Sequence, residues 1–338
     1  MNREYTVAIA GATGAVGEEL IQLLEERSFP VKELILLASA RSAGKTMTFR
    51  GEEIVIRELT HESFEGVEIA LFSAGGGISK EFAPSTAKAG AVVIDNSSAF
   101  RIDPDVPLIV PEINPEAAKD LKKGIIANPN CTTIVSLMAL APLHRKFGLK
   151  AIIASSYQAV SGSGTAGIQE LDQQVAALQK GEPIEQNVYP RQIAFNVIPQ
   201  VDVFDEGDYT KEELKMLNES RKILGVPDLE VTCTCVRVPV HRSHSVSISA
   251  QFEKPITPDS ARSAISRNPG IRVVDNPRAG EFPVPLDTTG KDDCLVGRIR
   301  QDRVLPNALA LWVVGDQVRK GAALNAVQIA ELIVKQNG

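Results

Sequence analysis

The 338-residue chain is poor in several residue types, and each shortage excludes a class of protein. Aromatic residues make up 5% of it, too few for the stacking platforms that bind single-stranded nucleic acid. The formal net charge of -6 provides no overall basic surface for DNA, RNA or an anionic membrane. No apolar run approaches the roughly 20 residues that a membrane-spanning helix needs. We therefore expect a globular protein that binds neither nucleic acid nor membrane.

Cysteine is also scarce, with four residues. Cys233 and Cys235 are close in sequence, but Cys-x-Cys without a second pair at metal spacing is a poor zinc motif. We therefore predict no bound metal and no disulfide framework. The first residues lead into a glycine-punctuated segment rather than the apolar stretch of a secretion signal, so we expect a cytoplasmic location.

Strand and helix patterns alternate through the first 130 residues. This alternation predicts a parallel sheet with helices on both faces. The expected strands cover 6–10, 34–39, 67–73 and 91–94, and the expected helices cover 18–26 and 78–88.

The pattern changes after residue 130. Runs rich in Val, Ile, Ser and Thr at 150–157 and 231–252 predict longer strands, whereas 181–208 contains three prolines and reads as irregular. We therefore expect an α/β fold of two domains. The predicted domains are a Rossmann-like dinucleotide-binding domain at 1–130 and an α+β catalytic and dimerisation domain at 131–318, with a C-terminal helix at about 319–338 that packs back on the first domain.

A glycine-rich segment at 11–17, Gly-Ala-Thr-Gly-Ala-Val-Gly, joins the first expected strand to the first helix. Small residues let the backbone approach a pyrophosphate, and the helix N-terminus stabilises its negative charge. The spacing differs from the commoner G-x-G-x-x-G, so a tight turn without a ligand is the alternative. The cofactor contacts predicted here are Gly11, Thr13, Gly14, Ala15 and Val16.

The end of the second expected strand favours NADP over NAD. An NAD site typically carries an acidic residue there, which binds the ribose 2′-hydroxyl. This chain instead has Arg41 between Ser39 and Ser42, groups that suit a 2′-phosphate. An exposed arginine in a basic loop is the alternative. Gly75, in the glycine run after the strand at 67–73, is expected to lie along the ribose and nicotinamide.

Cys131 follows the turn Asn-Pro-Asn at 128–130 and precedes a run with helical spacing. A thiol in the first turn of a helix lies near unpaired N–H groups and the positive end of the helix dipole, which both favour the thiolate. Beside a nicotinamide, such a thiol implies attack on an aldehyde, hydride loss and an acyl-thioester. A small buried structural cysteine is the alternative.

This reaction needs a general acid/base, and the chain has four histidines. His61 lies in a polar stretch and His144 lies late in the helix after Cys131, so both are expected to be structural. His241 and His244 remain, and the residues themselves do not choose between them.

Four segments together resemble the aspartate-semialdehyde dehydrogenases. They are 11–17, 128–133, Gln158 with Ser-Gly-Ser-Gly at 161–164, and 237–244, and they occur in the family's order over nearly the whole chain. The resemblance implies that Cys131 is the nucleophile and His244 the acid/base. It also implies that Gln158 holds the substrate near the thiol.

The resemblance extends to the binding residues. It implies that Arg237 grips the substrate carboxylate and that Arg101 binds phosphate. Glu212 and Lys215 follow a capping box that begins at Thr210, and in the family such a pair contacts the substrate amine and the phosphate. Without the resemblance this pair reads as a solvated ion pair. The remaining expected cofactor contacts are Ser161, Gly162 and Gln317.

The implied reaction is the NADP-dependent conversion of L-aspartyl 4-phosphate to L-aspartate 4-semialdehyde with release of inorganic phosphate. It belongs to the biosynthesis of lysine, diaminopimelate, methionine, threonine and isoleucine, and the resemblance implies a homodimer or tetramer. An N-acetyl-glutamyl-phosphate reductase would use the same chemistry without a carboxylate for a free amine. A glyceraldehyde-phosphate dehydrogenase is disfavoured by Arg41. A non-catalytic NADP-binding paralogue is disfavoured because no binding role requires Cys131, Gln158, Arg237 and His244 together.

Overall fold

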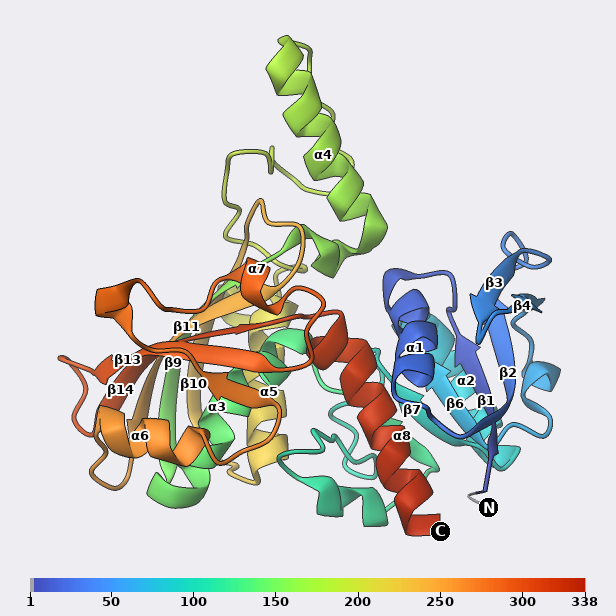
Figure 1. Cartoon of the computed structure of the whole chain (residues 1–338), viewed down its shortest axis with the longest axis horizontal. Helices are drawn as coiled ribbons and strands as arrows, with labels where there is room; N and C mark the ends of the chain where they lie inside the picture. Colours follow the sequence, from blue (N-terminus) through green and yellow to red (C-terminus); the bar gives the residue numbers. More distant parts are fainter. Residues whose placement is uncertain (1–2, 338) are drawn as a thin grey trace. The chain divides into compact units, whose positions relative to one another are not determined.

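The computed structural model describes residues 3–337 (Figure 1). The chain forms two compact units. One runs up to Asn130 and resumes from Ala322, and the other covers Cys131–Gly321. The C-terminal helix thus belongs to the first unit, and residues 319–321, which the sequence placed in that helix, belong to the second.

The first unit is built on a six-stranded parallel sheet with the order β5-β2-β1-β6-β7-β8. Its helices are α1 (Ala15–Glu26), α2 (Gly76–Lys88) and α8 (Leu324–Asn337). Its strands are β1 (Tyr5–Ala10), β2 (Val31–Ala38), β5 (Arg57–Glu58), β6 (Ile69–Phe72), β7 (Val92–Asp95) and β8 (Ile125–Ala127), with a separate hairpin of β3 (Thr46–Phe49) and β4 (Glu52–Val55).

Alternate side chains of the sheet pack against α1 and α8 in one core. Val7 and Ile9 of β1 join Leu20 and Leu24 of α1 in this core, and Val327 of α8 completes it from the other end of the chain. The apolar spacing of both helices explains their position, because each buries one stripe against the sheet. The predicted parallel α/β architecture is confirmed.

The second unit holds a mixed six-stranded sheet with the order β10-β9-β11-β14-β13-β12. Helices α3, α5 and α6 pack against its strands, and α4 extends away from this sheet (Figure 1). The strands are β9 (Leu149–Gln158), β10 (Glu230–Arg237), β11 (His244–Phe252), β12 (Ile271–Val273), β13 (Cys294–Gln301) and β14 (Ala308–Gly315). The helices are α3 (Cys131–Phe147), α4 (Gly164–Lys180), α5 (Lys211–Leu224), α6 (Pro258–Ile265) and α7 (Pro285–Thr288).

The strand-like run predicted at 231–252 is divided in two. Strand β10 ends at Arg237 and β11 begins at His244. Pro239 in the connection lacks an N–H for a sheet ladder, and Ser243 has a left-handed φ of 77°. This interruption places Arg237 at the end of β10 and His244 at the start of β11, the two strands that flank β9.

The two faces of the second sheet differ. Side chains of β9 alternate between a buried set and an outward set, and the outward Ile153 and Tyr157 are 47% and 38% exposed. The ring of Tyr157 lies 5.3 Å from that of Trp312 on β14. Across residues 3–337, the structure has no helix that combines the length and apolar character needed to cross a bilayer.

Candidate active site and cofactor hollow

Three buried polar side chains form a row across the second sheet. Arg237 of β10 pairs with Gln158 of β9. The next β9 residue back, Tyr157, pairs with Ser245 of β11, so the antiparallel register places His244 beside Gln158. Arg237, Gln158 and His244 are 5%, 1% and 0% exposed. The sheet therefore brings together three side chains that are separated by up to 86 positions in the sequence.

Helix α3 packs onto the same face of the sheet. Gly315 pairs with His244, and a Cβ at Gly315 would lie 2.8 Å from Val135 of α3. The helix begins at Cys131, as predicted, and this residue is partly exposed and forms no disulfide. A Cβ at Gly321 would lie 2.8 Å from the Cβ of Cys131. Glycine at 321 thus permits a close approach to the cysteine, a role that the sequence reading missed.

The imidazole of His244 has two different sides. Its Nδ1 accepts a hydrogen bond from the Ala159 N–H at 3.1 Å. Its Nε2 is buried and has no hydrogen-bond partner among the described residues. Burial, reinforced by the nearby Arg237 charge, holds the pKa of His244 well below its ordinary value. The neutral ring therefore carries its proton on Nε2, the atom left available for a ligand.

The other histidines have ordinary partners. The exposed His241 bonds through Nε2 to Asp172 of α4 at 2.6 Å. His144 accepts a hydrogen bond from the Leu149 N–H at 3.1 Å, and His61 bonds to Ser85 at 2.8 Å. Geometry thus separates His244 from His241, which the sequence could not do, although catalysis by His244 stays a prediction.

Arg237 and Gln158 are each held by specific contacts. The Nη1 atom of Arg237 donates to the carbonyl of Ala159 at 2.6 Å, and the guanidinium lies 5.9 Å from the ring centroid of Tyr189. The amide of Gln158 donates to Ser156 and to Glu212, both at 3.2 Å. These contacts fix the side chains of the row in one orientation.

Glu212 connects the row to a second charge. Its carboxylate lies 3.1 Å from Lys215, whose ammonium also reaches Asp202 at 2.9 Å. Burial lowers the pKa of Lys215, but the two carboxylates outweigh burial and raise it. Lys215 is therefore a fixed cation. Asp202 lies in the irregular 181–208 segment, and sequence reasoning missed it because nothing in that segment marks its partner.

The predicted capping box positions this pair. The Thr210 N–H donates to Glu213 at 2.7 Å, and the Glu213 N–H returns a bond to the Thr210 hydroxyl at 3.3 Å. The second carboxylate oxygen of Glu213 accepts the Cys235 N–H of β10 at 2.8 Å. Glu213 therefore ties the start of α5 to the sheet, which brings Glu212 to Gln158.

The first unit contains a hollow of about 570 Å³ at the carboxyl ends of its strands, the usual place for a ligand in such a sheet. Gly11 has a φ of 91°, and a Cβ at Gly17 would lie 2.3 Å from the Gly11 carbonyl oxygen. Both glycines are therefore required by the turn from β1 into α1. The lining residues are Gly11, Thr13, Gly14, Ala38, Ser39, Ala40, Glu58, Leu59, Ser73, Ala74, Ile78, Glu81 and Phe82.

Some predicted cofactor residues do not line this hollow. Arg41 is exposed and is not one of the lining residues, and the buried Ser42 donates its N–H to the Ser39 carbonyl at 2.8 Å. Ala15 and Val16 lie in the first turn of α1, and Gly75, with a φ of 91°, is the N-cap of α2. The hollow does contain Glu58 and Glu81, which the sequence reading missed. Glu58 pairs with Ala38 at the end of β2, where an acid would suit a ribose hydroxyl.

Four other predicted residues lie outside the hollow. Ser161 and Gln317 hydrogen-bond to each other in the second unit, and a Cβ at Gly162 would lie 2.7 Å from Arg237 and 3.4 Å from Nε2 of His244. Arg101, in the first unit, donates to the carbonyls of Asn128 at 2.9 Å and Asn96 at 2.8 Å. Their assigned roles toward cofactor and phosphate stay predictions.

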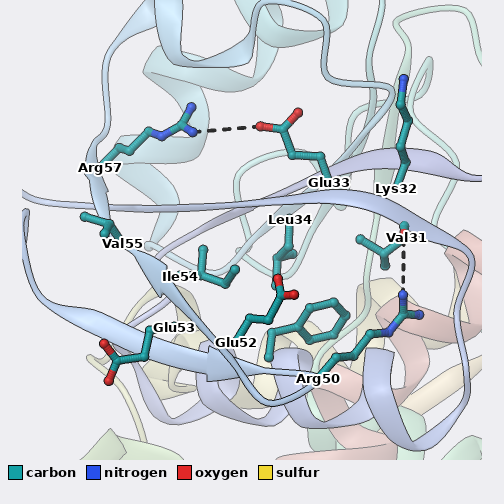
Figure 2. Close-up of a pocket in the computed structure, with 11 residues that line it drawn as sticks. Val31, Lys32, Glu33, Leu34, Arg50, Glu52, Glu53, Ile54, Val55 and Arg57 are labelled. Carbon is teal, nitrogen blue, oxygen red and sulfur yellow. Dashed lines mark hydrogen bonds and ion pairs between the residues drawn. The ribbon is translucent and has the colours of Figure 1, made fainter.

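A second cavity of the first unit, about 540 Å³, lies between β2 and the β3–β4 hairpin (Figure 2). Its Arg50 donates to the carbonyls of Val31 and Phe29, at 3.2 and 2.7 Å, and its Arg57 lies 3.8 Å from Glu33. Arg50, in the turn of the hairpin, thus ties the hairpin to the start of β2, whereas Arg57 of β5 pairs with a neighbouring strand of the sheet. Among residues 3–337, the structure groups no three His, Cys, Asp or Glu side chains as metal ligands.

The fold and the site define a class of enzyme. Residues 6–121 match the family model "Semialdehyde dehydrogenase, NAD binding domain", and residues 140–320 match "Semialdehyde dehydrogenase, dimerisation domain". The chain is therefore a semialdehyde dehydrogenase with a nicotinamide-dinucleotide domain.

Individual relatives narrow this class. The aspartate-semialdehyde dehydrogenase of Aquifex aeolicus is 55% identical, over 98% of each chain. The crystal structure of aspartate semialdehyde dehydrogenase II of Vibrio cholerae, complexed with ASA, is 48% identical, with a TM-score of 0.96 and coverage of 98% of this chain and 99% of that one. The enzyme of Candida albicans with NADP is 26% identical, with a TM-score of 0.78 and 99% coverage of each chain. The chain belongs to the aspartate-semialdehyde dehydrogenase family.

Proposed function

We propose that this protein converts L-aspartyl 4-phosphate to L-aspartate 4-semialdehyde with NADPH, and catalyses the reverse phosphorylating oxidation. The observation that carries the proposal is the row of Arg237, Gln158 and His244 on the sheet face that α3, beginning at Cys131, covers. A thiol, an imidazole and a guanidinium on one scaffold supply a nucleophile, a proton donor and a carboxylate site.

The Cys131 thiolate attacks the acyl carbon of the substrate, where a C–S bond forms and the C–O bond to phosphate breaks. NADPH, when bound, supplies the hydride that reduces the resulting thioester. The tetrahedral oxyanion then collapses to the aldehyde as its C–S bond breaks and the thiolate leaves. Nε2 of His244 donates its hydrogen bond to the oxyanion and the departing sulfur, because it is a buried donor that has no partner among the described residues.

Charges around the row would bind the ends of the substrate. Arg237 suits the α-carboxylate, since its planar guanidinium binds a carboxylate through two parallel bonds. Glu212 suits the free amine and Lys215 suits the phosphate. The family resemblance also assigns the phosphate to Arg101 of the first unit. The carboxylate of Glu212 beside Gln158 favours aspartate semialdehyde over an N-acetylated substrate, which lacks the positive charge.

The 2′-phosphate of NADP would be bound by Arg41, with the hydroxyls of Ser39 and Ser42 as further donors. The position of Arg41, three residues after the end of β2, supports this assignment, whereas Glu58 beside the same strand end would favour NAD. The proposed location is the cytoplasm, because its reducing environment keeps a catalytic thiol from forming a disulfide.

We also propose that two copies pair through the outward face of the second sheet. This face carries the exposed side chains of Ile153 and Tyr157, and Trp312 packs beside Tyr157. Burial of such an apolar surface favours association. A homodimer is the simplest closed assembly that covers the face on both copies.

The test is a spectrophotometric assay of NADPH formation. Purified protein is mixed with NADP, phosphate and one of three aldehydes: aspartate semialdehyde, N-acetyl-glutamate semialdehyde or glyceraldehyde 3-phosphate. We expect turnover with aspartate semialdehyde that depends on phosphate. Preference for either of the other aldehydes would overturn the proposal, and so would a lack of turnover by a protein that binds NADP.

A further inference from the structure

The residue before His244 has an unusual backbone conformation. Ser243 has a φ of 77° although it is not glycine, and it is 1% exposed. A buried residue keeps a left-handed conformation only where its surroundings hold it. Because β11 begins at the next residue, the conformation of Ser243 sets the direction in which His244 enters the sheet.

A glutamine side chain holds Ser243 in place. The Oε1 atom of Gln317 accepts the Ser243 N–H at 2.7 Å, and its Nε2 donates to the hydroxyl of Ser161. Gln317 is 4% exposed. Both polar atoms of its amide are thus engaged by residues of the second unit.

The glutamine is itself anchored by its neighbour. Asp316 is fully buried, and its carboxylate accepts hydrogen bonds from Arg242 and from the Gly290 N–H, both at 2.7 Å. The same carboxylate accepts the N–H groups of Val318 and Arg319, at 2.9 and 3.1 Å. The backbone on both sides of Gln317 is therefore fixed to the segment that precedes His244.

The hydrogen bond from Gln317 to Ser161 connects the glutamine to the turn that contacts Nδ1 of the imidazole. Ser161 belongs to the turn after β9, whose Ala159 N–H donates to Nδ1 of His244. Gln317 thus joins the two segments that hold His244. Ser243 precedes His244 in the chain, and the turn that contains Ala159 and Ser161 bonds the His244 ring.

We propose that Gln317 is a positioning residue for His244: its amide fixes Ser243 and Ser161 and so directs Nε2 toward the reacting atoms. The inference rests on the proposed function and refines it. This role differs from that of a nicotinamide contact. The Gln317 amide binds protein groups, and its loss is expected to act on catalysis through the orientation of His244.

A double-mutant cycle separates the two roles. The full-length enzyme with Gln317→Leu, His244→Asn or both is assayed for kcat with aspartate semialdehyde, phosphate and NADP. We expect Gln317→Leu alone to lower kcat about 10- to 100-fold, the size of effect of a misplaced catalytic group. In the His244→Asn background it should lower kcat less than about twofold, because coupled residues are not additive.

Two further variants act as controls. Gln317→Glu keeps the acceptor for Ser243, and the Ser161 hydroxyl can donate to it, so we expect this variant to fold and to recover part of the lost kcat. Gln301→Leu removes an exposed glutamine, which bonds the Ala308 carbonyl, and should leave kcat unchanged.

The binding of NADP, measured by calorimetry, should change less than about twofold in Gln317→Leu. Equal loss of kcat in both backgrounds would overturn the inference, and so would weaker NADP binding that accounts for the loss. Failure of the proposed function is distinguishable, because the unmodified enzyme would then not oxidise aspartate semialdehyde at all.

Discussion

Residues of the same type, only three positions apart, meet opposite environments in this protein. His241 is exposed and paired with Asp172, whereas His244 is buried with one nitrogen bonded to Ala159 and the other left for a ligand. The presence of histidine predicted acid/base chemistry. Which histidine performs it depends on the neighbours that β-sheet pairing brings from distant parts of the chain. Asp202 and Gly321 were missed for the same reason, since their partners lie in other segments.

The first residue-scale prediction compares the two histidines. We expect His244→Asn to lower kcat by about two to four orders of magnitude, the usual contribution of a positioned proton donor. His241→Asn should change kcat much less, because its partner is an exposed carboxylate. Steady-state kinetics measures kcat for both variants, and NADP binding checks that each variant is folded. A greater loss at His241 would mean that the acid/base is misassigned.

The second prediction concerns the 2′-phosphate. Arg41→Asp replaces a charge-assisted contact with repulsion, so it should weaken NADP binding far more than NAD binding, by about 2 kcal/mol or more. The dissociation constants of both cofactors are measured by titration. Glu58→Gln is the matched variant, and we expect it to weaken NAD rather than NADP. Equal losses of both cofactors in Arg41→Asp would remove the argument for NADP.

At the scale of elements, long periodic segments were predictable and short ones were not. The spacing of apolar residues predicted α1 and α8, because both bury one stripe in the core of the first unit. Strand β5 has two residues and β8 has three, too few for a period to appear. Helix α4 was also missed, since only four of its 17 residues are buried and just one of those, Leu171, is a large apolar residue.

The element-scale prediction tests the anchoring of α5. Glu213→Ala removes the acceptor for two main-chain N–H groups, of Thr210 and Cys235, and should cost about 1–3 kcal/mol in the free energy of unfolding. Because Glu212 then loses its fixed distance to Gln158, KM for aspartate semialdehyde should rise more than KM for NADP. Urea unfolding and steady-state kinetics measure the two effects. Glu230→Ala, an exposed substitution on β10, is the control; an unchanged KM in Glu213→Ala would contradict the anchoring role.

At the scale of the whole molecule, the sequence predicted two domains and the type of each, but not the register of the second sheet. The row of Arg237, Gln158 and His244 depends on that register, and no local pattern reveals which strands become neighbours. The family resemblance named these three residues from their sequence motifs, and their roles stay predictions. The contacts of Gln317, Asp316 and Ser243 became visible only in the folded chain.

The whole-molecule prediction concerns the dimer. Ile153→Asp introduces a charge into the outward face of β9 and should weaken association by about 2–5 kcal/mol, the usual cost of an unpaired charge at an interface. Val55→Asp, at a 54% exposed position of the first unit, is the matched control and should leave association unchanged. Sedimentation velocity over a range of concentrations gives the result. A wild-type monomer, or an Ile153→Asp dimer of unchanged stability, would exclude this face.

The most direct test of the account is detection of the acyl-enzyme on Cys131. The protein is incubated with aspartate semialdehyde and NADP without phosphate, quenched in acid and digested, and the peptides are weighed by mass spectrometry. We predict an aspartyl thioester on the Cys131 peptide that phosphate discharges. Cys131→Ala should show no adduct and no phosphorylating oxidation while it still binds NADP, since the thiol supplies chemistry and the loop at Gly11 supplies cofactor affinity. An adduct on another residue, or substantial turnover by Cys131→Ala, would contradict the account.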